Sequence, residues 1–121
     1  MKFEAILFDC DGVLVDSEPI TNGVLRDMLA EAGWVLTPEE CMRLFIGKMV
    51  RSEAARIEHH TGRPLTDEWM SAFYARRNAA LEAQLTAIEH IHGAVERVHA
   101  HHDGRIACAS GADRLKVEMQ L

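Results

Sequence analysis

Two aspartates near the start of the chain, Asp9 and Asp11, have the spacing of a catalytic or metal-binding pair. Residues two apart in an extended segment project to the same side, so the two carboxylates can converge on one point. A hard cation such as Mg²⁺, which prefers oxygen ligands, would offset their mutual repulsion. One carboxylate could also attack an electrophilic phosphorus while the other donates and later accepts a proton. The pair is therefore a candidate for phosphoryl-transfer chemistry, with Mg²⁺ held by Asp9 and Asp11.

The residues around this pair predict the element that positions it. The apolar run Ala5 to Phe8 is too short for a helix, so we expect a parallel strand buried on both faces, with the acids at its carboxyl end. Open α/β sheets bind ligands at that end. A calcium loop of the EF-hand type is disfavoured, because Val13 stands where a third acid is needed and a strand stands where a helix is needed. A merely solvated acidic turn would not explain the apolar run.

The segment Asp9-Cys10-Asp11-Gly12-Val13-Leu14-Val15-Asp16-Ser17-Glu18 resembles the first motif of the haloacid dehalogenase superfamily. Its Asp16-Ser17-Glu18 ending is similar to the branch that contains sugar-phosphate phosphatases, phosphoglycolate phosphatase and β-phosphoglucomutase. The resemblance implies an α/β fold, a Rossmannoid core of parallel strands with an inserted α-helical cap. It also implies Asp9 as nucleophile, Asp11 as acid and base, and Mg²⁺ as cofactor. On this basis residues 1–16 and 88–121 would form a partial core and residues 17–87 the cap.

The sequence between the two core segments predicts four helices. The first follows Ser17 and Pro19 and ends at Gly33, and the second opens at the capping box of Thr37 and Glu40. A third covers about 50–60 and stops before Gly62 and Pro64, and a longer fourth one begins near Thr66. Four helices in succession fit the cap that the resemblance implies.

Two cations in this helical region, Lys48 and Arg51, are candidates for substrate contact. They follow Gly47 in a short linker and helix start, where the resembled family places substrate-contacting groups. The alternative is that both are solvated surface charges, which are common on helices. The sequence leaves both interpretations open.

A second candidate site lies near the end of the chain. The apolar run from Ile106 to Ala109 predicts another short buried strand, and Ser110 and Gly111 lead from it into a helix near Ala112 or Asp113. A hydroxyl with free backbone N–H groups at a helix start can bind an anion, although a plain helix cap is the alternative. The segment resembles the superfamily's second motif, which implies that Ser110 and Gly111 hold the transferring phosphoryl group.

The resemblance covers the whole chain but includes only the first half of a typical family member. Relatives carry a third motif with a lysine and a fourth with further acids, both beyond the position of Leu121. Lys116 is not expected to be the third-motif lysine, because it lies in the helix directly after Ser110. We therefore expect a missing C-terminal segment, and little or no turnover by this polypeptide alone.

Composition argues against several classes of protein and kinds of site. The net charge is -6 and no basic run occurs, so the sequence argues against nucleic-acid binding. No apolar stretch reaches signal-peptide or membrane-span length, and the three cysteines show no C-x-x-C spacing. The histidines lack zinc-site partners. We expect a soluble cytoplasmic protein with reduced thiols and no membrane association.

Three functions follow from different classes. The favoured one is a Mg²⁺-dependent phosphatase that acts on a small phosphorylated sugar or sugar acid through an aspartyl phosphate. A mutase of the β-phosphoglucomutase kind would pass the phosphoryl group to another sugar hydroxyl instead of water. A non-catalytic fragment would expose apolar sheet edges and act by self-association or by pairing with a second polypeptide.

Overall fold

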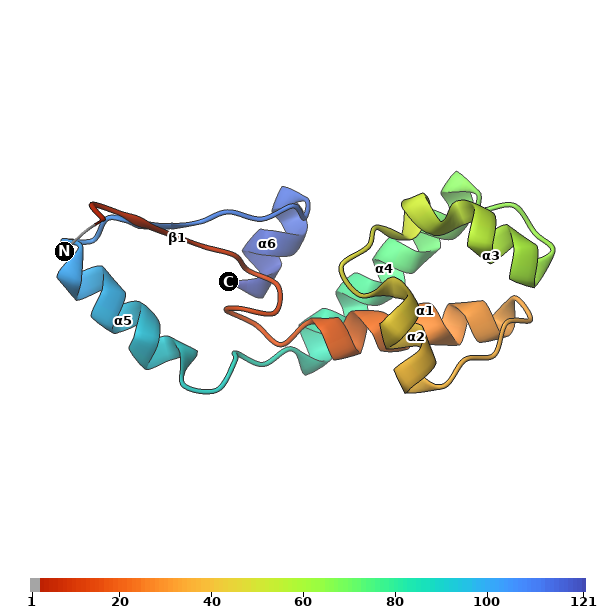
Figure 1. Ribbon diagram of the computed structural model, residues 1–121, viewed down its shortest axis with the longest axis horizontal. Coiled ribbons are helices and arrows are strands. Elements are labelled where there is room, and N and C mark those ends of the chain that lie inside the picture. The colour runs from red at the N-terminus through yellow and green to blue at the C-terminus, as the bar shows by residue number, and fades with distance from the viewer. Residues whose placement is uncertain (1–2) are drawn as a thin grey trace. The chain divides into compact units, whose positions relative to one another are not determined.

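The computed structural model describes residues 3–121, which form two compact units (Figure 1). The first unit combines the segment that ends at Ser17 with residues Gln84–Leu121, and the second is Glu18–Ala83. The first is a mixed α/β unit and the second is entirely helical, so the α/β fold class expected from the sequence is confirmed. The core and cap roles expected for residues 1–16 with 88–121 and for 17–87 stay a prediction.

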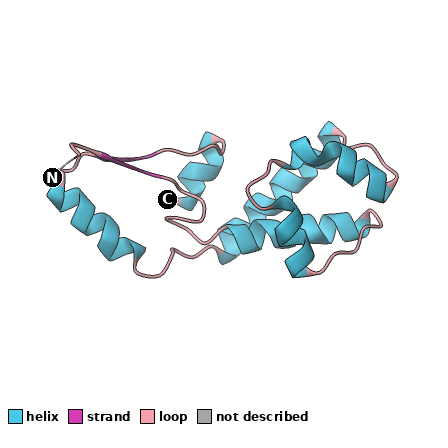
Figure 2. Cartoon of the chain, viewed as in Figure 1, coloured by secondary structure: helices cyan, strands magenta, loops and turns pink. Residues whose placement is uncertain are grey.

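A two-stranded parallel sheet organises the first unit. Strand β1 (Ile6–Phe8) pairs with β2 (Ile106–Cys108) in the register Ile6 to Ile106 and Phe8 to Cys108. The two strands, magenta in Figure 2, run side by side although a hundred residues separate them. The Ala109 amide extends this pairing by donating to the Phe8 carbonyl at 2.7 Å. Parallel pairing brings the carboxyl ends of both strands to the same edge.

Helix α5 (Ile91–His101) precedes β2 and ends at a tight turn. The turn contains Asp103 at φ 50° and Gly104 at φ 76°, both in the left-handed region that stops a helix. The left-handed conformation of these two residues therefore ends α5 and leads the chain into β2. Two further backbone hydrogen bonds, Asp16 to Thr86 and Ile88 to Leu14, tie the two segments of this unit together.

The predictions that the first strand is buried on both faces and that the second strand is buried are wrong. Leu7 keeps 70% of its surface exposed, and Ala107 and Cys108 are exposed on β2. Side chains alternate between the two faces of a strand, and the face that carries Leu7 and its partner Ala107 is mostly exposed. The apolar composition of the runs predicted strands correctly, but burial depends on what packs against them.

The second unit contains helices α1 (Glu18–Glu31), α2 (Pro38–Phe45), α3 (Ala54–Thr61) and α4, which begins at Asp67 and ends at Gln84. The predicted caps are confirmed: Thr37 Oγ1 accepts a hydrogen bond from the Glu40 amide at 3.2 Å, and Gly62 ends α3 at φ 70°. The third helix differs from its prediction, because its first turn, η1 (Val50–Glu53), is a 3₁₀-helix.

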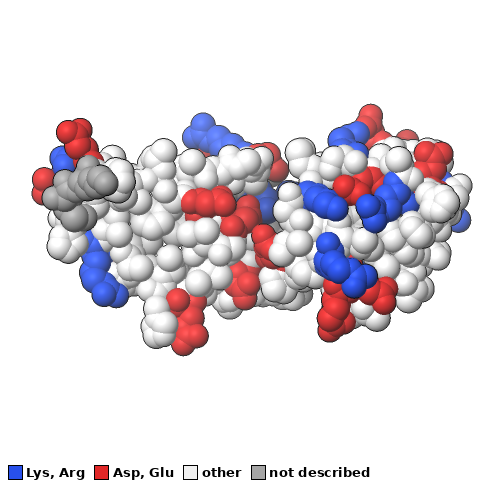
Figure 3. Space-filling model, viewed as in Figure 1, with Lys and Arg blue, Asp and Glu red and all other residues white. Residues whose placement is uncertain are grey.

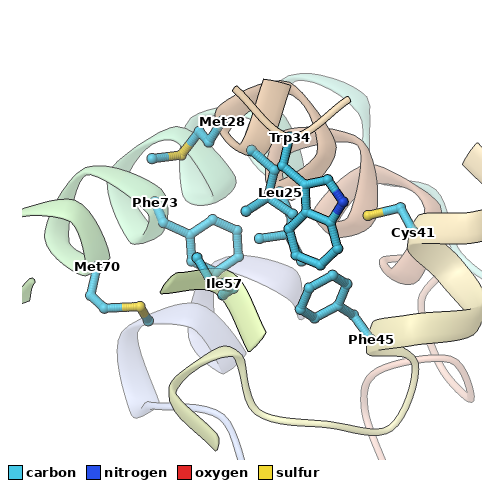
Figure 4. Close-up of a cluster of buried hydrophobic side chains, with 9 residues drawn as sticks. Leu25, Met28, Trp34, Cys41, Phe45, Ile57, Met70 and Phe73 are labelled. Carbon is cyan, nitrogen blue, oxygen red and sulfur yellow. The ribbon is translucent and has the colours of Figure 1, made fainter. Parts of the chain in front are cut away.

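All four α-helices contribute to one apolar core in this unit (Figure 4). Leu29 of α1 and Cys41 of α2 are completely buried, and Trp34 packs edge-on against Phe45 with ring centroids 6.0 Å apart. Burying one such large side chain contributes about 1.5–3 kcal/mol. The full core consists of Leu25, Met28, Leu29, Trp34, Cys41, Phe45, Ile57, Met70 and Phe73.

The surface charges of both signs lie close to one another. Figure 3 shows blue and red side chains as neighbours on the face drawn, and several form exposed ion pairs, such as Arg76 with Glu31 at 2.8 Å. Between residues 3 and 121, no helix is both long enough and apolar enough to cross a membrane.

Candidate active site

The segment after β1 forms a compact turn that presents two aspartates. The turn is closed by hydrogen bonds from the Leu14 amide to the Cys10 carbonyl and from the Gly12 amide to the Val15 carbonyl, both at 2.9 Å. Gly12 adopts φ 75°, a left-handed conformation that glycine takes without strain. Cys10 is completely buried, and this anchors the turn between the two carboxylates.

Asp9 is the exposed member of the pair. It directly follows Phe8, the last residue of β1, and its Oδ1 accepts a hydrogen bond from the Cys10 amide at 2.8 Å. This local bond fixes the orientation of the carboxylate relative to the backbone. An exposed, oriented carboxylate at the carboxyl end of a parallel strand can attack a ligand bound there.

Asp11 is held by two side chains that the sequence analysis did not select. Ser17 Oγ donates to Asp11 Oδ1 at 2.7 Å, and Lys116 Nζ donates to the same oxygen at 3.0 Å. Burial raises the pKa of the Asp11 carboxyl, but the hydrogen bonds from Ser17 and Lys116 and the Lys116 charge outweigh it, so the pKa lies below its usual value. Asp11 is therefore ionised near neutral pH.

Helix α6 (Arg114–Gln120) carries Lys116 to this position. Asp113 caps the helix, because its side chain accepts a hydrogen bond from the Lys116 amide at 2.9 Å. One turn further on, Gln120 Nε2 donates to Cys10 Sγ at 3.4 Å. Lys116 and Gln120 thus lie on one helix face and bind consecutive residues, Asp11 and Cys10, of the turn 9–15, which we call the aspartate segment.

Ser110 lies beyond the end of β2, at the sheet edge where Asp9 follows β1. Its Oγ accepts a hydrogen bond from the Ala112 amide at 3.0 Å, so the hydroxyl organises the turn into α6. A Cβ built on Gly111 would meet no atom within 4 Å, so the backbone there is sterically open. The sheet register thus brings the two predicted motifs to one edge.

Lys48 and Arg51 are engaged in ion pairs within the helical unit. Lys48 Nζ lies 3.9 Å from Glu53, and Arg51 binds the exposed Asp67 at 2.8 Å. Both cations are exposed, and exposed pairs of this kind contribute about 0–1 kcal/mol. These contacts agree with the surface-charge interpretation, and substrate contact by Lys48 or Arg51 stays a prediction.

The residues fit a magnesium ion in part. Asp9 and Asp11 supply the carboxylate oxygens that Mg²⁺ prefers. Over residues 3–121, however, no group of three or more histidine, cysteine or acidic side chains lies together, so protein side chains alone do not complete a metal shell there. Lys116 already neutralises part of the charge on Asp11. The exposed Asp9 is therefore the better oxygen donor of the two.

Ser17, Lys116 and Gln120 were missed as site residues by the sequence analysis. Ser17 follows Asp11 within the first motif, and its 1% exposure marks it as a buried hydroxyl that needs a partner. For Lys116 and Gln120 the available signal was their spacing of four residues, which places two long polar side chains on one helix face.

The comparisons with known proteins agree with this geometry. A family model described as haloacid dehalogenase-like hydrolase matches residues 3–121, and the chain belongs to this family. A conserved haloacid dehalogenase-like protein of unknown function from Agrobacterium tumefaciens has a similar structure, with 28% sequence identity and a TM-score of 0.81. The match covers 98% of this chain and 52% of that protein.

Two further relatives carry functional information. A hydrolase of the same family from Deinococcus radiodurans, solved with bound phosphate and sodium, is 30% identical with a TM-score of 0.72, over 98% of this chain and 51% of its own. The 6-phosphogluconate phosphatase of Escherichia coli is 48% identical over 46 residues, which are 38% of this chain and 21% of that protein. The chain thus spans about half the length of the similar structures and a fifth of this phosphatase.

Proposed function

We propose that this chain belongs to a phosphatase that hydrolyses a small phosphorylated sugar or sugar acid. The observation that carries the proposal is the placement of Asp9 and Asp11 at the end of β1, one exposed and the other held by Ser17 and Lys116. Two carboxylates in such different surroundings suit different tasks, one as nucleophile and one in proton transfer.

The chemistry proceeds in two steps. An Asp9 oxygen attacks phosphorus, the bond from phosphorus to the sugar oxygen breaks, and Asp11 delivers a proton to that leaving oxygen. Because Asp11 is ionised in the free protein, a substrate phosphate monoanion can supply this proton on binding. Water then attacks the aspartyl phosphate, gives its proton to Asp11, and releases inorganic phosphate and the free Asp9 carboxylate.

The second motif would hold the phosphoryl oxygens. Ser110 and the open backbone at Gly111 lie at the same sheet edge as Asp9, which is the placement that this role requires. A Mg²⁺ ion bound by Asp9 and Asp11 would neutralise negative charge that develops on the phosphoryl group. Its remaining ligands would come from water, the substrate or further protein residues.

The substrate class rests on the E. coli relative. That protein acts on 6-phosphogluconate, a phosphorylated sugar acid, and shares 48% identity over 46 residues with this chain. Lys48 and Arg51 are the candidate contacts for the part of the substrate that is not the phosphoryl group. To contact the substrate, Lys48 would leave its ion pair with Glu53 and Arg51 would leave its ion pair with Asp67. Both cations could then bind the anionic or hydroxylated part of the substrate.

A phosphate-release screen tests the proposal. The full-length natural protein is incubated with Mg²⁺ and a panel of sugar phosphates, sugar-acid phosphates and polyol phosphates, with a nucleotide and a phosphopeptide as controls. The proposal predicts release from the sugar or sugar-acid group and dependence on Mg²⁺. Activity on the controls alone would overturn the substrate class, and turnover that requires a hexose bisphosphate would indicate a mutase instead.

A further inference from the structure

A buried lysine outside both sequence motifs makes direct contact with Asp11. Lys116 exposes only 8% of its surface, and its Nζ lies 3.0 Å from Asp11 Oδ1. A buried ammonium group is costly unless a partner compensates its charge. Asp11 provides that compensation, so the position of each side chain depends on the other.

The contact is part of a larger attachment of α6 to the aspartate segment. Asp113 holds the Lys116 amide, and Gln120 binds Cys10, the residue between the two aspartates. On the other side, the buried Ser17 donates to the same Asp11 oxygen as Lys116 does. Two donors from opposite ends of the chain thus converge on one oxygen and restrict rotation of the carboxylate.

We infer that Lys116 is a positioning residue that, together with Ser17, holds the Asp11 carboxylate in the orientation needed for proton transfer. The inference rests on the proposed function, since it assigns Lys116 a task in that reaction. Lys116 acts through Asp11 and does not bind substrate, so its removal lowers kcat and leaves KM nearly unchanged. A misplacement of about 1 Å in an active site can lower the rate by about 10²-fold.

The kinetic test compares three variants with the unaltered full-length natural protein, on a sugar phosphate found in the screen and with saturating Mg²⁺. Lys116→Met removes the charge and keeps the apolar stem, and we expect kcat to fall at least about tenfold with KM within about twofold. Lys116→Arg keeps a buried donor and restores part of kcat. The matched control is Arg114→Gln on the same helix, which loses only an exposed pair with Glu118 and keeps full activity.

A double-mutant cycle tests the contact without relying on activity. Unfolding equilibrium constants are measured for Asp11→Asn, Lys116→Met and the double variant. We expect coupling of about tenfold or more, because neutralising Asp11 relieves the effect of removing Lys116. If Lys116→Met fails to fold and the double variant folds, the coupling is established in the same direction.

The outcomes separate the inference from the proposed function. If the double-mutant cycle shows no coupling, or if Lys116→Met and the double variant both fail to fold, the inferred contact between Lys116 and Asp11 is overturned. Coupling with an unchanged kcat, or a rise in KM alone, overturns the positioning role and leaves the phosphatase proposal intact. If the unaltered full-length natural protein releases no phosphate from any sugar phosphate while coupling is measured, the proposed function has failed and the positioning role fails with it.

Discussion

Lys116 Nζ lies 3.0 Å from Asp11 Oδ1, which joins two residues 105 positions apart in the chain. The contact connects the last helix to the turn after the first strand, and both belong to the same compact unit. Asp11 is thereby distinguished from Asp9, which is exposed and accepts a hydrogen bond from its neighbour's amide. This difference between two nearby carboxylates is the basis for assigning them different chemical tasks.

Ser17→Ala should destabilise the protein. The substitution removes a 2.7 Å hydrogen bond to Asp11 from a hydroxyl that is 1% exposed. Hydrogen bonds to charged groups contribute about 1.5–3 kcal/mol, so the free energy of unfolding in urea should fall by about that amount. The control is Ser52→Ala, which removes an exposed hydroxyl that donates to the Met49 carbonyl. Its free energy of unfolding should change by no more than about 0.5 kcal/mol. Equal effects of the two substitutions would contradict the buried Ser17 contact.

The helical unit should depend strongly on Leu29. This side chain is completely buried in the core, so Leu29→Ala leaves a cavity and should cost about 2–5 kcal/mol. Val35, which is 78% exposed, is the matched aliphatic position, and Val35→Ala should change stability by less than about 0.5 kcal/mol. Thermal and chemical unfolding of both variants would check this contrast, and a small effect at Leu29 would mean that the core is packed differently.

The three thiols should differ in reactivity. Cys108 is exposed on β2, whereas Cys10 and Cys41 are buried. Burial raises the pKa of both buried thiols, which further lowers their thiolate fraction near neutral pH. A chromogenic disulfide reagent should therefore react rapidly with one thiol, that of Cys108. The Cys108→Ser substitution should remove this rapid phase of the reaction. Rapid labelling of Cys41, identified by peptide mass spectrometry, would argue against the packing of the helical unit.

The raised pKa of Cys41 predicts how stability depends on pH. In the unfolded chain this thiol ionises near its ordinary value of about 8.5, while in the folded unit burial keeps it protonated. The unfolded state then binds fewer protons, so the free energy of unfolding falls as pH rises from the ordinary pKa through the folded one. The decline between pH 7 and pH 10 should be steeper in the unaltered protein than in Cys41→Ala. If the free energy of unfolding declines equally in the two proteins, the Cys41 thiol is not shielded from solvent in the folded unit.

Local features were predictable from the sequence because they depend on neighbouring residues. The apolar run before Asp9 predicted a strand, Thr37 and Glu40 predicted a helix start, and Gly62 predicted a helix end. The chain turns after Asp11 at Gly12, which adopts a left-handed conformation that glycine takes without strain. Each of these depends on backbone preference or a contact within a few residues.

Burial and long-range pairing could not be predicted in the same way. The apolar runs predicted that β1 is covered on both faces and that β2 is buried, yet Leu7 and Cys108 are exposed, because burial depends on packing from other elements. The contact of Lys116 with Asp11 depends on how α6 rotates against the turn, which no local pattern specifies. The place of Lys116 directly after Ser110 argues against a third-motif lysine, and no local pattern indicates its partnership with Asp11.

The most direct test of the account is to locate the phosphoryl group during turnover. The full-length natural protein is mixed with a sugar phosphate from the screen and Mg²⁺ and quenched in acid, and its peptides are analysed by mass spectrometry. We predict a phosphoryl adduct on Asp9. Asp9→Asn should abolish both the adduct and phosphate release while leaving the fold intact, and the exposed Asp103→Asn should change neither. Phosphate release that survives in Asp9→Asn, or an adduct on another residue, would contradict the assignment of Asp9 as nucleophile.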